Sequence, residues 1–209
     1  MSLLSDRVGK TSQVVVIPAS LEDRAKAPAG LYRLGLLLTC AWIFTFFGAL
    51  EVAFFWRATT MEFWQPIPLP NTLWVSTMVI LASSIVFERA RRLYRRGAYP
   101  IAFSMLRVTA CIGAAFLASQ LTAWHELVLR GVYLKMNPYN SFIYIFTGLH
   151  GVHLLGGLIA LGMLLVRRSK RAPDGTPARP RRELVDAVCY YWHFMGLLWV
   201  VLFGTLLVA

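Results

Sequence analysis

Long, uninterrupted runs of apolar residues alternate along the chain with short polar connections. Five runs reach the roughly 20 residues of helix that a bilayer core requires, and they cover about 32–56, 71–89, 101–124, 141–166 and 185–208. Strands of a membrane β-barrel would instead alternate apolar and polar residues over about 10 positions. A helix satisfies its backbone hydrogen bonds within the segment, as lipid requires. The pattern therefore predicts an all-α polytopic membrane protein, a bundle of five transmembrane helices.

Composition agrees with this pattern and separates a short polar arm from the rest. The 209 residues are 57% hydrophobic and 15% charged, which is too apolar for an ordinary soluble domain, a disordered chain or a disulfide scaffold. The first residues are polar and contain no apolar core of signal-peptide type. We expect a polar cytoplasmic N-terminal arm over 1–31 and one membrane domain over 32–209.

The positive charge is distributed unevenly between alternate connections. The net charge is +11, from 21 Lys+Arg against 10 Asp+Glu. Seventeen of the basic residues lie near the N-terminus and in the 88–100 and 167–184 loops, and three lie in the 57–70 and 125–140 loops. Since basic loops stay in the cytoplasm, the N-terminus is predicted to be cytoplasmic and the C-terminus outside. Topology accounts for the whole excess, so no nucleic-acid partner is expected.

Ionisable residues inside a membrane span indicate a functional site by default. Glu51 lies at a depth similar to that of Gln120, and a hydrogen bond between these two side chains is one interpretation. A proton-handling group and a lipid head-group contact are the alternatives for Glu51. Arg107 lies near the cytoplasmic end of the third span, where its side chain is expected to reach the interface or a lipid phosphate.

Three histidines fall at nearly the same depth. His150 and His153 are three residues apart and share one helix face, and His193 lies at a similar level in the last span. Together they are candidates for a metal or haem site. The alternative is that each donates to a carbonyl or side chain of a neighbouring helix. No carboxylate or cysteine is expected at the matching depth, which disfavours a metal.

Two other kinds of polar residue have plain interpretations. The three cysteines, Cys40, Cys111 and Cys189, lie in apolar runs without CxxC spacing, so small, buried, reduced side chains are expected. Glu88 lies beside an arginine run at the inner end of the second span, where a solvated ion pair is expected.

Two motifs carry a resemblance to a known family. GLHGVHLLGGLIAL (148–161) and CYYWHFMGLLWVVLF (189–203) resemble subunit III of the haem–copper respiratory oxidases. The family pattern G-x-H-G-x-H with a trailing glycine is matched by Gly148, His150, Gly151, His153 and Gly157. The pattern Y-W-H-F followed by a tryptophan is matched by Tyr191, Trp192, His193, Phe194 and Trp199.

The resemblance extends over about residues 34–209, with two departures. PLPNTLWVSTMVILASS (68–84) is similar to the family's entry into a serine-rich helix, and FLASQLTAWHEL (116–127) to its glutamine-to-glutamate segment, here Gln120 and Glu126. Ile43 stands where many members have a glutamate, and Gly196 stands where they have an aspartate. Both departures weaken any expectation of direct proton handling.

The resemblance implies a non-catalytic subunit III, in its short five-helix form, of a proton-pumping cytochrome c oxidase in aerobic respiration. Implied partners are the catalytic subunit I and other oxidase subunits, phospholipid, and as a further candidate a larger respiratory supercomplex. The implied location is the bacterial inner membrane. Haem and copper are expected in partner subunits, and no catalytic residue, cofactor or metal is expected in this chain.

Site residues under this interpretation are structural. The side chains expected to make helix contacts are His150, His153, His193, Trp192, Gln120, Glu126 and Glu51, and Arg107 is expected to meet a lipid head group. Two alternatives stay open. One is an accessory subunit of a quinol oxidase or a nitric oxide reductase. The other is an autonomous histidine-rich metal-binding protein or transporter of the membrane.

Overall fold

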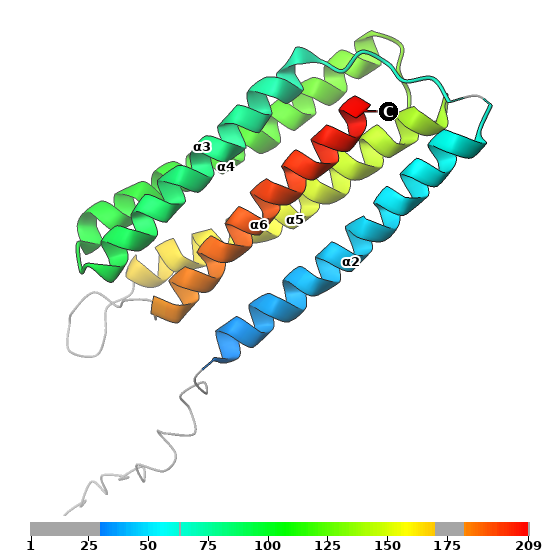
Figure 1. Ribbon diagram of the computed structural model, residues 1–209. Coiled ribbons are helices and arrows are strands. Elements are labelled where there is room, and N and C mark those ends of the chain that lie inside the picture. Colours follow the sequence, from blue (N-terminus) through cyan, green and yellow to red (C-terminus); the bar gives the residue numbers. More distant parts are fainter. Residues whose placement is uncertain (1–29, 63, 170–181, 209) are drawn as a thin grey trace, which may run out of the picture. The chain divides into compact units, whose positions relative to one another are not determined.

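Five long helices follow one another along the chain. The computed structural model describes residues 30–62, 64–169 and 182–208. The helices are α2 (Leu31–Thr60), α3 (Asn71–Arg95), α4 (Tyr99–Leu129), α5 (Pro138–Ser169) and α6 (Arg182–Val208), as Figure 1 shows. All five are long and apolar enough to cross a membrane. The predicted all-α fold with five spans is confirmed, whereas the arm before residue 30 lies outside the described residues.

Helices α3 and α4 extend beyond the predicted apolar spans. α3 continues through the arginine run to Arg95, and α4 continues to Leu129. Arginine and glutamate are good helix formers, and Glu88 accepts a hydrogen bond from Arg92 at 2.8 Å, one turn later on the same helix. The charged residues after the second apolar run therefore prolong the helix instead of starting a loop.

Glycines with positive φ end both helices of the α3–α4 pair. Gly97 has φ +83°, and the amide of Ala98 reaches back to the carbonyl of Leu93 at 3.0 Å. Gly131 has φ +74° at the end of α4, where Val132 bonds to the carbonyl of Leu127 in the same way. This is the Schellman arrangement, which requires a left-handed residue after the helix. At Gly97 this arrangement turns the chain sharply, so α3 and α4 run antiparallel side by side.

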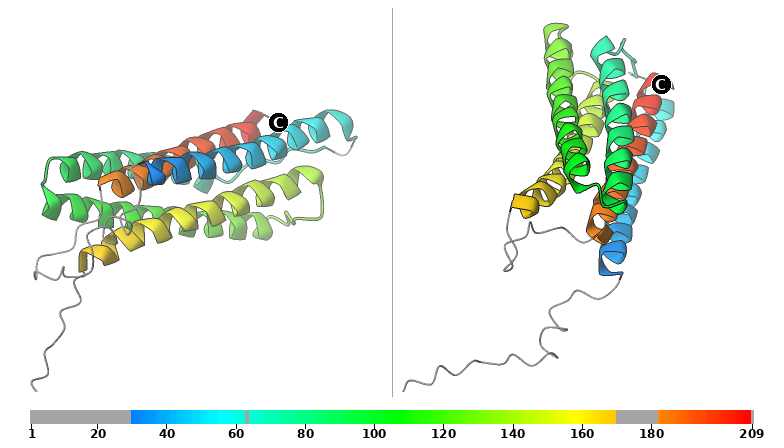
Figure 2. Two further views of the ribbon diagram at one scale, coloured as in Figure 1. Left: turned by 90° about the horizontal axis from the view of Figure 1, so that it is seen from below. Right: turned by 90° about the vertical axis from the view of Figure 1, so that its left-hand side faces the viewer.

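Helices α3, α4, α5 and α6 pack as a closed ring. The backbones approach closely between α3 and α4, α4 and α5, α5 and α6, and α6 and α3. In the left view of Figure 2, α4 and α5 form one layer and α3 and α6 form the other. The buried aromatic side chains of the ring include Phe87, Phe116, Trp192 and Trp199.

Helix α2 contacts the ring through long side chains instead of close backbone packing. Its buried residues are Ile43, Phe47 and Phe54. The ring of Phe54 lies 5.3 Å from that of Phe142 on α5, centroid to centroid. The opposite side of α2 exposes large apolar side chains, among them Leu34, Leu38, Val52 and Trp56. One face of this helix is therefore free to meet lipid or another subunit.

Candidate functional site

Helix α3 contributes three buried hydroxyl groups to the centre of the ring. We call Ser76, Thr77 and Ser83 the α3 hydroxyl row. Each member accepts a hydrogen bond from a side chain on another helix. The pairs are Gln120 Nε2 to Ser76 Oγ at 3.0 Å, Trp199 Nε1 to Thr77 Oγ1 at 2.9 Å, and Trp192 Nε1 to Ser83 Oγ at 2.9 Å. The row joins α3 to both α4 and α6.

The hydroxyls of the row are oriented by their own helix. Ser76 and Thr77 donate to the carbonyl of Leu73 at 2.9 and 2.8 Å, and Ser83 donates to that of Ile80 at 2.7 Å. A hydroxyl has one proton and two lone pairs. Since the proton is used within α3, the lone pairs face the incoming N–H groups. Each hydroxyl is thereby fixed as an acceptor.

Other neighbouring helices in the bundle are tied in the same way. Tyrosine and tryptophan donors link α4 to α5 and α5 to α6, and a threonine links α6 to α2. The bonds are Trp124 Nε1 to Thr147 Oγ1 at 2.9 Å, Tyr139 Oη to the Leu206 carbonyl at 2.7 Å, Tyr191 Oη to the His153 carbonyl at 2.9 Å, and Thr205 Oγ1 to Glu51 Oε2 at 2.8 Å. Polar side chains inside a helical membrane protein serve this purpose when their partners lie on other helices.

The predicted hydrogen bond between Glu51 and Gln120 is wrong. Gln120 is buried and turns to Ser76 on α3, whereas Glu51 accepts from Thr205 on α6. Their similar depth in the sequence does not bring the two helices together, because the ring places α4 next to α3 and α5, whereas α2 lies outside it. Glu126 also contacts α3, where its carboxylate accepts from the hydroxyl of Thr72.

The candidate three-histidine metal site, which the sequence already disfavoured, is not formed. The group of ligating side chains that comes together in the described part of the chain contains His193 but neither His150 nor His153. His150 is fully buried between the rings of Phe116 and Trp199, at centroid distances of 5.9 and 5.1 Å. Neither of its ring nitrogens has a hydrogen-bond partner among the described residues. The expected donation to a neighbouring helix is therefore absent at this position.

His153 and His193 point to different neighbours. His153 Nδ1 lies 2.7 Å from the Leu149 carbonyl of its own helix, and its ring packs edge-on against Phe47 of α2 at 5.5 Å. His193 Nε2 lies 3.7 Å from a carboxylate oxygen of Glu88 on α3. His150 and His153, which were expected to share one helix face, therefore face different surroundings. His150 lies inside the ring of helices, and His153 packs against α2.

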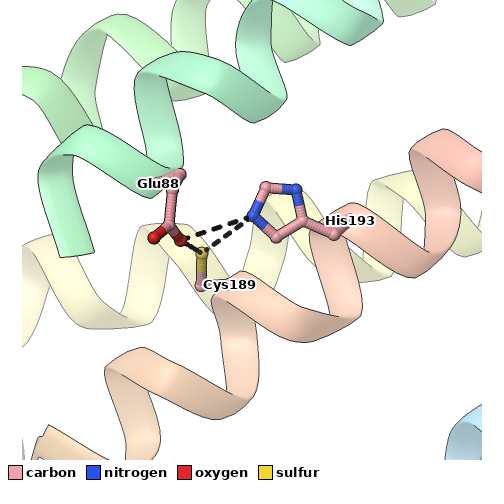
Figure 3. Close-up of side chains that lie close together, drawn as sticks. All are labelled: Glu88, Cys189 and His193. Atoms are coloured by element: carbon pink, nitrogen blue, oxygen red, sulfur yellow. Dashed lines mark hydrogen bonds and ion pairs between the residues drawn. The ribbon is translucent and has the colours of Figure 1, made fainter. Parts of the chain in front are cut away.

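His193 has both a carboxylate and a thiol beside it, contrary to expectation. Glu88, Cys189 and His193 place one ligand atom each within 4.8 Å of one another. Figure 3 shows these three side chains facing one another across α3 and α6. The ion pair expected for Glu88 is present, because its carboxylate accepts from Arg91 and Arg92, each at 2.8 Å. The Glu88 side chain is only 21% exposed, however, so the pair is partly buried rather than fully solvated. The packing of α3 against α6, which the sequence alone does not reveal, places Glu88 beside Cys189 and His193.

Arg107 and the three cysteines differ in their exposure. Arg107 is exposed on α4 and donates to Ser104 Oγ at 3.1 Å, its one side-chain hydrogen bond among the described residues. Cys189 is buried and Cys40 half-buried, but Cys111 is exposed, so the expectation that all three cysteines are buried is wrong for Cys111. All three are free thiols.

Comparison with known proteins agrees with this geometry. Residues 33–208 match the family described as cytochrome c oxidase subunit III. The chain belongs to this family. It is 34% identical over 167 residues to a probable cytochrome c oxidase subunit 3 of Nocardia farcinica, which covers 77% of this chain and 79% of that protein. It is 33% identical, with the same coverage, to a probable cytochrome c oxidase subunit 3 of Mycobacterium tuberculosis.

A more distant relative is named for a different oxidase. The chain is 28% identical over 135 residues to cytochrome bo(3) ubiquinol oxidase subunit 3 of Pseudomonas aeruginosa, covering 65% of this chain and 62% of that protein. Membership of the subunit III family makes this chain a multi-pass membrane component of an oxidase complex that contains other oxidase subunits. The expectation of an oxidase subunit III is confirmed.

Both departures from the expected family pattern face the interior. Ile43 is 1% exposed on α2. Gly196 is buried on α6, and a Cβ atom there would lie 3.1 Å from Ser84 Oγ. Neither position offers an ionisable group in this subunit III. Glu51 lies two helical turns from Ile43 and has its own partner, Thr205.

Several contacting residues were not predicted from the sequence. They are Thr72, Ser76, Thr77, Ser83, Trp124, Tyr139, Thr147, Cys189 and Thr205. One signal was available, because positions 72, 76 and 83 recur on one face of a helix in an otherwise apolar run. That spacing predicts a polar stripe, but it does not say which helix supplies the donors.

Proposed function

We propose that this subunit III serves a proton-pumping oxidase that takes electrons from cytochrome c, and that it stabilises the catalytic subunit I. In the same proposal the chain lies in the bacterial inner membrane with its N-terminus in the cytoplasm, and haem and copper belong to partner subunits. Two relatives named as cytochrome c oxidase subunits are 34% and 33% identical to it. The ubiquinol oxidase relative is 28% identical, which favours cytochrome c.

The observation that carries the stabilising role is the α3 hydroxyl row. The three buried hydroxyl groups of the row each accept a hydrogen bond from a buried side chain on α4 or α6. Side chains paired in this way hold neighbouring membrane helices together. The four-helix ring, together with the exposed apolar face of the adjoining helix α2, is suited to support a larger membrane subunit.

Lipid binding is the second part of the proposal. Arg107 is exposed on α4, and within the described part of the chain only its Nη2 group donates, to Ser104 Oγ. Guanidinium groups recognise phosphate through paired hydrogen bonds. An Arg107→Gln variant in the complex should retain less phospholipid after detergent washing, and unchanged lipid content would contradict this part.

Purification through an affinity tag on this chain tests the main proposal. In mild detergent, the tagged chain should bring down a complex with a haem absorption spectrum and a catalytic subunit. Reduced cytochrome c should support oxygen consumption, and ubiquinol should not. Consumption supported by ubiquinol alone would instead favour the quinol oxidase alternative.

A complex assembled without this chain tests the stabilising role. Its initial rate and haem content should match those of the whole complex, and its activity should decline faster during continuous turnover. A Gln120→Leu/Ser83→Ala variant should lie between the two, and Ser119→Ala provides a matched control. A complex without the chain that sustains full activity would contradict the proposal.

A further inference from the structure

Three side chains of different chemistry meet where α3 and α6 approach their charged ends. Cys189 and His193 are one helical turn apart on α6, and Glu88 faces them from α3, as Figure 3 shows. Cys189 Sγ lies 3.5 Å from His193 Nε2 and 3.8 Å from Glu88 Oε2, and the latter two atoms are 3.7 Å apart. The three atoms thus form a nearly equilateral triangle.

The dimensions of this triangle suit zinc. Tetrahedral zinc binds thiolate at about 2.3 Å and imidazole or carboxylate at about 2.0–2.1 Å, so its ligand atoms are separated by about 3.3–3.6 Å. The observed separations of 3.5, 3.7 and 3.8 Å exceed these values by a few tenths of an ångström at most. Small side-chain movements would bring all three atoms into the first coordination shell.

The carboxylate remains available although arginines surround it. Arg91 Nε donates to Glu88 Oε2 at 2.8 Å, and both Arg91 and Arg92 donate to Oε1 at 2.8 Å. A carboxylate has about four lone-pair positions, so Oε2 retains one on the side of Cys189 and His193. The arginines also fix the orientation of the carboxylate, as outer-shell partners do in metal sites.

The cluster is accessible on one side. Side-chain exposure is 36% for His193 and 21% for Glu88, whereas Cys189 is buried. Both accessible residues line a groove of about 620 Å³ that also includes Ser84, Arg89 and Arg92. This volume exceeds the roughly 30 Å³ share of one water molecule. An ion can therefore enter, and water can complete a fourth coordination position.

We propose that Glu88, Cys189 and His193 bind one zinc ion, which bridges α3 and α6. Binding converts the Cys189 thiol to a thiolate and releases its proton to solvent. Zinc has no redox chemistry, so the site adds a structural link and leaves electron transfer to other subunits. This proposal replaces the expectation that the chain holds no metal, because the cysteine and carboxylate missing from that reasoning lie beside His193.

Metal titration of the purified oxidase complex tests the proposal, with the chain carrying an affinity tag free of histidine. After chelator treatment, zinc affinity is measured by competition with a chromophoric chelator, and cobalt(II) replaces zinc for absorption spectra. Cys189→Ser and His193→Gln should each weaken zinc binding roughly tenfold or more, since loss of mere outer-shell partners already costs 10–100-fold. Cys111 and His125 are exposed residues of α4 that do not belong to the cluster. Cys111→Ser and His125→Gln are therefore the matched controls and should bind zinc as the wild type does.

The cobalt spectrum of the wild-type complex keeps the test decisive even if a Cys189 or His193 variant fails to assemble, because the absence of a thiolate band in the wild type alone contradicts the proposal. Wild-type complex should show a thiolate-to-cobalt charge-transfer band that Cys111→Ser retains and Cys189→Ser lacks. Three results would each overturn the proposal: no such band in the wild type, equal zinc affinity in the wild type and the Cys189 and His193 variants, or equal losses in the Cys111 and His125 controls.

Discussion

The indole of Trp192 on α6 lies so close to Gly113 on α4 that no side chain fits between them. A Cβ atom at Gly113 would be 2.6 Å from Cη2 and 2.8 Å from Cζ2 of Trp192. The indole cannot move aside easily, because its Nε1 donates to Ser83 and its ring packs against Phe87 at 6.0 Å. The absence of a side chain at Gly113 therefore allows the backbone of α4 to lie against the hydrogen-bonded indole of Trp192.

Gly113→Ala should destabilise the ring for this reason. Overpacking of a filled interior costs about 1–3 kcal/mol, so the complex should lose this chain at a lower temperature or detergent concentration than the wild type. Gly156→Ala is the matched control, since a Cβ atom there meets nothing within 4 Å. Equal stability of the two variants would show that Trp192 is not held as described.

Ser83→Ala should weaken the α3–α6 contact. The change leaves Nε1 of Trp192 buried without an acceptor, and such losses between membrane helices average about 1 kcal/mol or less. The measurement is the thermal stability of the purified complex. Ser119→Ala removes a hydroxyl that bonds only the Phe116 carbonyl of its own helix among the described residues, and it should have little effect.

A double variant separates this hydrogen bond from general packing. Trp192→Phe alone should be destabilising, but adding Ser83→Ala to it should cost less than Ser83→Ala costs in the wild type. Residues that share one interaction are non-additive in this way. Strict additivity would mean that the 2.9 Å bond contributes nothing to stability.

Glu51→Gln should preserve assembly and sustained oxygen consumption. Thr205 donates to one carboxylate oxygen of Glu51 at 2.8 Å, and the amide oxygen of glutamine can accept the same bond. Glu51→Leu should loosen α2, because the Thr205 hydroxyl loses its acceptor there. If Glu51→Gln assembles normally but loses proton pumping, Glu51 handles protons and the structural interpretation fails.

His150→Leu should leave stability unchanged or slightly raised. The imidazole is fully buried, and neither nitrogen has a partner among the described residues. Replacing an unpaired buried polar group by an apolar one of similar volume removes a desolvation penalty. Thermal unfolding of the complex gives the answer, and a loss of about 1 kcal/mol or more would contradict it.

The sequence was sufficient for the architecture. The backbone N–H and C=O groups of a continuous apolar run must be hydrogen-bonded within the run when it lies in lipid, and a helix achieves this. Five helical spans in residues 32–208 could therefore be predicted without knowing which helices pack together. The GLHGVHLLGG and YYWHF motifs were specific enough to indicate the subunit III family. The helix ends did not follow from the pattern, because a run of arginines after Glu88 is compatible with a loop and with a continued helix. In the structure α3 continues through this run to Arg95.

Contacts between helices were decided only by the tertiary structure. Depth along a span gives one coordinate of a side chain, whereas pairing also depends on which helices are adjacent and how each is rotated. Equal depth therefore suggested Glu51 with Gln120 and His193 with the other histidines, and both pairings are wrong. Adjacency of α3 and α6 instead joined Ser83 to Trp192, and Glu88 to Cys189 and His193, because residues about 100 positions apart in sequence meet only once the ring closes.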